Sequence, residues 1–238
     1  PLIVRSVTHA FSLHEIFLKC NGAFLFEGSA WFDGQSPLMG LSPFAFFESK
    51  QGISVFTFQN ASQEWERKTE SSNDPLACLQ RVLDQFRLPK TASDPPFSHG
   101  GAVGYLGYDL IQQYEPVLAP TAPAPSGLPE IRMDFINCFL RTNLRDQTTQ
   151  IVYNPAPLVA LGWPPDLAVK TGHRFIAEIE KKLLDTTVVS APECPLGPMQ
   201  KTHSKEDYIQ MVKRALDYIA AGDIFQANLS HRFHATVQ

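Results

Sequence analysis

The sequence predicts an α+β fold, and three observations lead to this prediction. Short apolar segments rich in aromatic and β-branched residues, bounded by Gly, Pro or Ser, are typical of strands and recur through Ala23–Phe58. Two later segments, Asp74–Phe86 and Ser204–Gly222, instead repeat their apolar residues at helical spacing. Of the 238 residues, 44% are hydrophobic and 18% are charged, which is typical of a folded protein rather than a disordered one.

The predicted strands fall into two groups. The first group forms a β-rich meander and consists of Ala23–Gly28, Pro37–Leu41, Pro43–Ser49 and Ile53–Phe58. The second group consists of Phe135–Leu144 and Thr148–Pro155, which a turn around Arg145–Gln147 is expected to join.

Asp74–Phe86 is predicted to be an amphipathic helix, because its apolar residues fall on one face and Pro75 stands in the first turn. The apolar stripe consists of Leu76, Leu79, Leu83 and Phe86. A further helix is predicted at His173–Leu184.

The clearest helix prediction lies near the end of the sequence. Ser204 and Asp207 have the spacing of a capping box, with Asp in place of Glu, and Gly222 stands where a left-handed C-cap is expected. The apolar stripe of this helix consists of Tyr208, Met211 or Val212, Ala215 and Ile219.

Proline-rich segments separate these elements and predict irregular structure. Glu115–Glu130 contains five prolines in sixteen residues, so it is expected to be an extended surface loop. A second such loop is predicted at Asn154–Asp166, and Ser190–Pro198 is expected to interrupt all regular structure.

After Ile224 the hydrophobic period changes to two, which predicts a strand at Ile224–Phe233. One face is largely apolar and consists of Phe225, Ala227, Leu229, His231 and Phe233. The other face is polar and consists of Gln226, Asn228, Ser230 and Arg232. A continuous polar face predicts either water or a polar cavity on that side of the strand.

The sequence ends five residues after Phe233, so the last helix and strand have no following elements with which to pair. We therefore expect a first domain at 1–190, a linker at 191–201 and the start of an incomplete second domain at 202–238. The strand at Ile224–Phe233 is expected to be an exposed or poorly paired edge.

Composition also argues against several classes of function. The net charge of −4 and the scattered Lys and Arg residues predict no nucleic-acid partner. No apolar run reaches the length of about 18 residues needed to span a bilayer, and no signal peptide is recognised, so we expect a cytoplasmic protein without a membrane partner. The four cysteines lie far apart without a CxxC pair, which predicts neither a zinc site nor a disulfide framework.

The stretch "GGAVGYLGYD" (100–109) suggests a phosphate-binding turn, but its spacing argues against one. Its glycines stand at Gly100, Gly101, Gly104 and Gly107, so there is neither a G-x-G-x-x-G turn nor a P-loop. We expect these glycines to allow a close approach between backbone segments. Tyr105 and Tyr108 are then expected to pack, and Asp109 to cap or pair.

Two longer motifs resemble the signatures of one known family. "FSHGGAVGYLGYDL" (97–110) resembles the "GGxxGYxxYD" signature of the chorismate-utilising synthases, namely anthranilate synthase component I and aminodeoxychorismate synthase component I. "YIAAGDIFQANLSHRFHA" (218–235) is similar to the "GDIFQVNLSQRF" segment that opens their chorismate-binding domain. "GQSPLMGLSPFAFF" (34–47) is similar to their "GRYSFLGADPF". The order and separation of the motifs also fit this family.

The resemblance implies both a fold and a reaction. The implied fold, like that of aminodeoxychorismate synthase, has antiparallel sheets packed orthogonally with outer helices. In the implied reaction chorismate is aminated at C4, with ammonia from a separate glutamine amidotransferase subunit (component II) and with Mg²⁺ bound to the substrate carboxylate. Anthranilate synthases commonly carry valine where this chain has Asn228, so Asn228 favours the aminodeoxychorismate branch, which leads to p-aminobenzoate and folate. Gln226 and Asn228 are the candidates for facing the substrate.

The catalytic groups implied by the resemblance are absent from this sequence. Members of that branch use a lysine nucleophile in a "PIKGT" motif, together with downstream glutamates for acid–base work and metal binding. Lys201, Lys205 and Lys213 do not match this motif. We therefore expect no catalytic residue and no metal ligand in this chain, and we expect the chain alone to be inactive.

The family can also bind tryptophan between N-terminal strands, through a serine-bearing strand and the "GRYS" turn. The corresponding candidates here are Gly28, Ser29, Gln35, Ser36, Pro37 and Leu38. Gln35 replaces the arginine of the turn, and Pro37 replaces its serine and removes a backbone donor, so the match is weakened. Two alternatives to the aminodeoxychorismate branch remain open: anthranilate synthase component I, and a non-catalytic module that binds an amino acid or the amidotransferase subunit.

Overall fold

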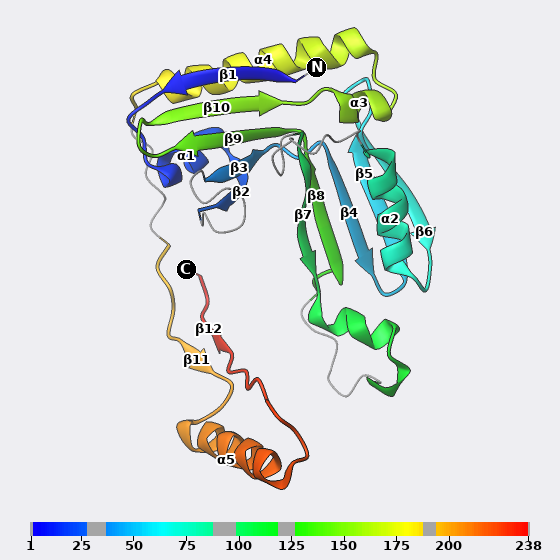
Figure 1. Ribbon diagram of the computed structural model, residues 1–238, viewed down its shortest axis with the longest axis vertical. Coiled ribbons are helices and arrows are strands. Elements are labelled where there is room, and N and C mark those ends of the chain that lie inside the picture. Colours follow the sequence, from blue (N-terminus) through cyan, green and yellow to red (C-terminus); the bar gives the residue numbers. More distant parts are fainter. Residues whose placement is uncertain (1, 28–36, 88–98, 119–126, 188–193, 238) are drawn as a thin grey trace. The chain divides into compact units, whose positions relative to one another are not determined.

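The computed structural model describes residues 2–27, 37–87, 99–118, 127–187 and 194–237. The chain divides into two compact units, Pro1–Ser190 and Ala191–Gln238. Figure 1 labels the elements of both units.

The first unit contains two five-stranded antiparallel sheets. The first sheet has the strand order β1 (Ile3–Thr8), β10 (Thr148–Tyr153), β9 (Cys138–Asn143), β3 (Leu38–Leu41) and β2 (Gly22–Phe26). The second has the order β6 (Trp65–Ser71), β5 (Ile53–Gln59), β4 (Ala45–Lys50), β8 (Ile131–Ile136) and β7 (Gly101–Leu106). Figure 1 shows the strands of the two sheets crossing at a steep angle. The predicted α+β fold with antiparallel sheets is confirmed.

Two neighbouring chain segments bend together from one sheet into the other. The chain leaves β3 and enters β4 through Ser42–Phe44, and it leaves β8 and enters β9 through Asn137. Because β3 pairs with β9 and β4 pairs with β8, the two bends lie side by side. Ser42 takes up the turn with a positive φ of 40°. Strands that switch sheets in this way form the corner of an orthogonal packing.

Helices cover both sheets and close a continuous core. In Figure 1, α4 (Pro165–Leu184) runs along β1 and β10, and α1 (Leu13–Cys20) packs against α4. On the other sheet α2 (Pro75–Gln85) packs against β5. The most deeply buried large side chains include Ile16, Phe47, Leu140, Ile151 and Ile179. Burying each such side chain contributes about 2 kcal/mol, so this shared core holds the two sheets together.

The structure adds elements that the sequence did not predict. These are β1, α1, β6 and α3 (Ala156–Ala160), and α3 lies inside the predicted loop at Asn154–Asp166. All seven residues of β6 are exposed, so this strand carries no alternation of buried and exposed positions. The prolines around α3 led to the prediction of a loop. Proline is nevertheless compatible with the first turn of a helix, so a short helix can form here.

Several predicted boundaries were also wrong. The helix predicted from His173 begins at Pro165, and the strand predicted at Phe135–Leu144 is divided at Asn137 between β8 and β9. In α2 the predicted stripe residue Leu76 is 37% exposed. The buried stripe of α2 consists of Pro75, Cys78, Leu79 and Val82. Part of the loop predicted at Glu115–Glu130 is the short 3₁₀ helix η3 (Pro116–Leu118), and residues 119–126 lie outside the described residues.

The second unit contains β11 (Gln200–Lys201), α5 (Lys205–Ala221) and β12 (Phe233–His234). The predicted capping box is confirmed, because Ser204 Oγ accepts a hydrogen bond from the Asp207 N–H. Gly222 is confirmed as a left-handed C-cap with a φ of 83°. No residue of α5 is buried.

The predicted strand at Ile224–Phe233 is wrong for most of its length. Only β12, at its end, pairs with another strand, and its partner β11 is two residues long. Alternation of side chains decides which face a residue occupies, but a strand also needs a neighbouring backbone to accept its hydrogen bonds. Within the described part of the chain, no helix has the length and apolar character needed to cross a membrane.

Candidate functional site

The glycine motif forms the edge strand β7 and its flanks, which lie against β8 and the residue before it. A Cβ atom on Gly104 would overlap the carbonyl group of Arg132, and one on Gly100 would overlap the carbonyl oxygen of Ile136. Gly100 also has a φ of 97°, which other residues rarely adopt. A Cβ atom on Gly107 would stand 3.1 Å from the carbonyl oxygen of Glu130. Backbone contact between the two strands therefore explains these glycines without a ligand.

The polar residues of the same motif lie at the surface. The Tyr105 hydroxyl donates to the carbonyl oxygen of Pro129 at 3.1 Å. Asp109 lies in the first turn of the 3₁₀ helix η2 (Tyr108–Gln113) and accepts from Gln112 Nε2 at 3.3 Å. Tyr108 is 92% exposed, so the expectation that it packs is wrong for the described residues.

The two substrate-side candidates come together in the second unit. Gln226 Nε2 donates to Asn228 Oδ1 at 3.4 Å, and both residues are exposed. They lie in an extended segment outside any strand, since β12 begins only at Phe233. Whether these amides face chorismate stays a prediction.

The tryptophan-site candidates are only partly described. Gly28, Ser29, Gln35 and Ser36 lie outside the described residues. Pro37 is buried and its carbonyl oxygen accepts from the Thr142 N–H at 3.2 Å. Leu38 is buried in β3 and belongs to a small apolar cluster with Phe139 and Val152. These two residues therefore have packing roles, and tryptophan binding stays a prediction.

The described residues do not provide a magnesium site. Among them, no group of three or more His, Cys, Asp or Glu side chains lies together in a way that could hold a metal ion. The described residues therefore do not include a set of ligands that would hold Mg²⁺ for a chemical step.

The cysteines are free thiols, and three of them, Cys20, Cys78 and Cys138, are buried. Burial raises the pKa of Cys20 to about 11 and raises the pKa of Cys138 further. Because the thiolate is the reactive form, Cys20 and Cys138 are poor nucleophiles at neutral pH.

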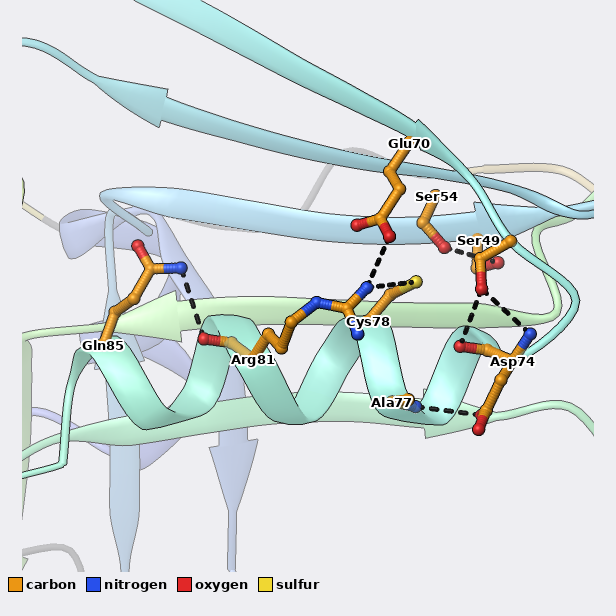
Figure 2. A network of polar contacts seen from close by, with 9 residues as sticks. Ser49, Ser54, Glu70, Asp74, Ala77, Cys78, Arg81 and Gln85 are labelled. Carbon is orange, nitrogen blue, oxygen red and sulfur yellow. Dashed lines mark hydrogen bonds and ion pairs between the residues drawn. The ribbon is translucent and has the colours of Figure 1, made fainter.

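Cys78 belongs to a polar network between α2 and the second sheet, which Figure 2 shows. Arg81 Nη2 donates to Glu70 Oε1 at 2.5 Å and to Cys78 Sγ at 3.2 Å. Behind this pair, the buried hydroxyls of Ser49 and Ser54 are hydrogen-bonded to each other at 3.2 Å. Arg81 and Glu70 thus tie the exposed strand β6 to the helix.

The start of α2 is fixed by a second part of the same region. Asp74 Oδ1 accepts hydrogen bonds from the Ala77 N–H at 3.0 Å and from the Tyr114 hydroxyl at 2.8 Å (Figure 2 shows the first). These two donors lower the pKa of Asp74. All the groups in this network have protein partners, so the network anchors the helix rather than presenting a reactive group.

A cavity of about 460 Å³ lies at the corner where the two sheets meet. Its wall includes Ser42 and Pro43 from one bend and Asn137 from the other. No residue of its wall was among the functional candidates that the sequence suggested. The one available signal was Trp163, a large side chain inside a proline-rich segment.

Comparison with known proteins gives consistent results. The model of the chorismate binding enzymes matches residues 42–238. Anthranilate synthase component 1 of Acetivibrio thermocellus is 30% identical over 234 residues, which cover 93% of this chain and 44% of the relative. Aminodeoxychorismate synthase component 1 of Escherichia coli (strain K12) is 26% identical over 185 residues, which cover 77% of this chain and 36% of the relative.

A solved structure is similar over nearly the whole chain. Anthranilate synthase component I from Streptococcus pneumoniae TIGR4 superposes with a TM-score of 0.59 at 20% sequence identity, covering 98% of this chain and 49% of that one. At this level of identity the likeness shows the shared fold alone. The chain spans less than half the length of these relatives.

Proposed function

This chain belongs to the family of chorismate binding enzymes, and from this membership we propose that the whole protein aminates chorismate. The observation that carries the proposal is the family match over residues 42–238, which includes both the glycine strand and the segment around Asn228. The similarity to component 1 of two aminating synthases supports the reaction class.

In the proposed reaction, ammonia replaces the C4 hydroxyl of chorismate. The C4–O bond breaks, a C4–N bond forms and water leaves, which gives 4-amino-4-deoxychorismate. The ammonia is supplied by a glutamine amidotransferase subunit as partner. Mg²⁺ is proposed for the whole protein, with ligands outside the described residues of this chain.

Asn228 supports the aminodeoxychorismate branch. It stands where anthranilate synthases commonly carry valine, and its amide can form hydrogen bonds that a valine side chain cannot. The second candidate is anthranilate synthase, and the relatives favour it. The Acetivibrio thermocellus anthranilate synthase is 30% identical to this chain, whereas the Escherichia coli aminodeoxychorismate synthase is 26% identical.

We further propose that these 238 residues do not carry the catalytic nucleophile. Lys205 and Lys213 lie in the exposed helix α5, and Lys201 lies in the exposed strand β11. All three side chains are exposed, whereas a nucleophilic lysine typically lies in an apolar pocket or beside another cationic group. The chain alone is expected to leave chorismate unchanged.

Genetic complementation tests the proposal and separates its two branches. The complete coding sequence is expressed in one bacterial strain that requires p-aminobenzoate and in another that requires tryptophan. Growth of the first strain without p-aminobenzoate is the expected result. Rescue of the tryptophan-requiring strain alone would replace the proposal by anthranilate synthase, and rescue of neither by an expressed protein would contradict chorismate amination.

A further inference from the structure

The cavity at the sheet corner, which we call the corner cavity, is built from segments far apart in the sequence. The two bends between the sheets form one side, at Ser42–Phe44 and at Asn137–Cys138. The hairpin between β5 and β6 contributes Gln59, Gln63 and Trp65, and α4 contributes Thr171, Arg174 and Phe175. Its volume of about 460 Å³ lies within the usual range for small-molecule sites. Neither of the two described tryptophan-site candidates, Pro37 and Leu38, lines it.

Six of the fifteen described residues that line the corner cavity are aromatic, and several of them are fixed by contacts within the protein. Trp163 is 2% exposed, and its indole N–H donates to the carbonyl oxygen of Gln59 at 2.9 Å. The rings of Phe46 and Trp65 are tilted by 32° with centroids 5.2 Å apart, and those of Tyr153 and Phe175 are tilted by 46° with centroids 6.3 Å apart. Aromatic side chains fixed in this way offer apolar surface to a flat ring without the cost of ordering new side chains.

One end of the cavity is polar. The Asn137 amide is 3% exposed and is fixed by donating to the carbonyl oxygen of Asn154 at 3.0 Å. Burial raises the pKa of Tyr153 to about 12, while the Asn137 amide and the Arg174 guanidinium act in the opposite direction. Asn137, Tyr153 and Arg174 all line the cavity.

Arg174 gives the cavity its charge. It is the one charged side chain among the described lining residues. Among the described residues, Arg174 forms an ion pair with Glu178, which lies on the next turn of α4 at 4.0 Å. Both side chains are about 60% exposed. Such an exposed pair contributes little, so the guanidinium can turn toward an anion at the mouth of the cavity.

We infer that the corner cavity binds a small planar aromatic monoanion, with its ring against the aromatic side chains of the wall and its anionic group at Arg174. The inference goes beyond the proposed amination, because the described lining residues all belong to the first unit and include none of the segment around Asn228. The aromatic side chains of the wall favour a planar ring, and the single cation Arg174 favours one negative charge on the ligand.

Tryptophan fluorescence provides a direct readout. Two of the three tryptophans of the chain, Trp65 and Trp163, line the cavity. The purified protein is titrated with benzoate and, in parallel, with benzamide, which has the same ring and no charge. We expect a saturable change in fluorescence with benzoate and binding of benzamide about tenfold weaker, because a charge-assisted hydrogen bond is lost.

Three variants test whether the signal comes from this cavity. Arg174→Gln should weaken benzoate binding about tenfold and leave benzamide binding unchanged. Thr171→Phe should abolish binding of both probes by filling the cavity. Lys182→Gln, which removes a charge from the exposed face of the same helix, is the matched control and should bind benzoate normally.

Circular dichroism and thermal unfolding first establish that each variant is folded. The absence of a saturable signal with benzoate would overturn the inference. Equal binding of benzoate and benzamide, or benzoate binding that survives both Arg174→Gln and Thr171→Phe, would overturn it as well.

Discussion

Because the side chain of Gly104 is a single hydrogen atom, the backbone of β7 can lie close to the backbone of β8 at this position. Gly104→Ala would place a methyl group on the carbonyl group of Arg132, and backbone cannot rotate away as a side chain could. We expect a loss of about 3 kcal/mol in the free energy of unfolding, measured by urea denaturation.

Gly107→Ala is the matched control for this substitution. Its Cβ atom would stand 3.1 Å from the carbonyl oxygen of Glu130, which a small adjustment can relieve. We expect a loss of about 1 kcal/mol. Equal losses for the two variants would contradict the view that close backbone approach explains the glycine at 104.

His9 gives the first unit a dependence on pH. Its Nε2 lies 2.6 Å from Thr149 Oγ1, and its Nδ1 accepts the Phe11 N–H at 3.2 Å, so the ring is neutral with its proton on Nε2. Burial lowers the pKa of His9. The unfolded chain therefore binds more protons than the folded chain below about pH 7, and stability contributed by His9 is lost as the pH falls.

The variant His9→Gln isolates this effect. It removes the titrating ring, so the stability advantage of the original protein over the variant should shrink between about pH 7.5 and pH 5.5. Urea denaturation of both proteins at each pH gives the two free energies. An advantage that grows as the pH falls would show that the folded state prefers the protonated ring.

At the scale of elements, α4 and α5 are both long helices but are held in different ways. Five residues of α4 are buried, at Ala168, Gly172, Ile176, Ile179 and Leu183. No residue of α5 is buried, and its described contacts at the ends are the capping box and the Gly222 cap. Tertiary packing supplies most of the stability of a helix in a protein. The two helices should therefore open at different rates.

Hydrogen exchange followed by mass spectrometry measures this difference. Amides of α5 are expected to exchange at least about tenfold faster than amides of α4. Equal protection of the two helices in the monomeric protein would contradict the exposed position of α5.

Local sequence signals predicted the elements that have both a periodic pattern of apolar residues and recognisable boundary residues, such as turns or helix caps. The strands β9 and β10 were recognised from apolar runs on either side of a polar turn, and α5 from its capping residues at Ser204 and Gly222. The strand β6 was missed because all its side chains are exposed, so only pairing with β5 defines it. The strand predicted from Ile224 failed for the opposite reason, since its pattern meets no long partner strand in the part of the chain that the structure describes.

At the scale of the molecule, the site was less predictable than the fold. The glycine motif lies in one continuous segment, so its spacing could be read from the sequence and its close contacts anticipated. The corner cavity combines Pro43, Asn137, Trp163 and Arg174, which come together only because two strands change sheets side by side. No local pattern encodes that juxtaposition, because it depends on the packing of both sheets.

Family membership connects these features to chemistry. The shared fold explains the glycine strand as architecture, and the family match extends through Asn228 to the end of the sequence. The amination of chorismate is therefore the central claim for the whole protein, and the position of the new nitrogen distinguishes its two branches.

The most direct test is to incubate the whole protein with chorismate, Mg²⁺ and ¹⁵N-labelled ammonium and to identify the product by NMR and mass spectrometry. We expect a product that keeps the side chain of chorismate and carries ¹⁵N at C4, and no product when the 238-residue chain is used alone. Aromatic anthranilate, labelled at the other ring position, would contradict the aminodeoxychorismate branch. Chorismate that remains unlabelled and unchanged would contradict amination itself.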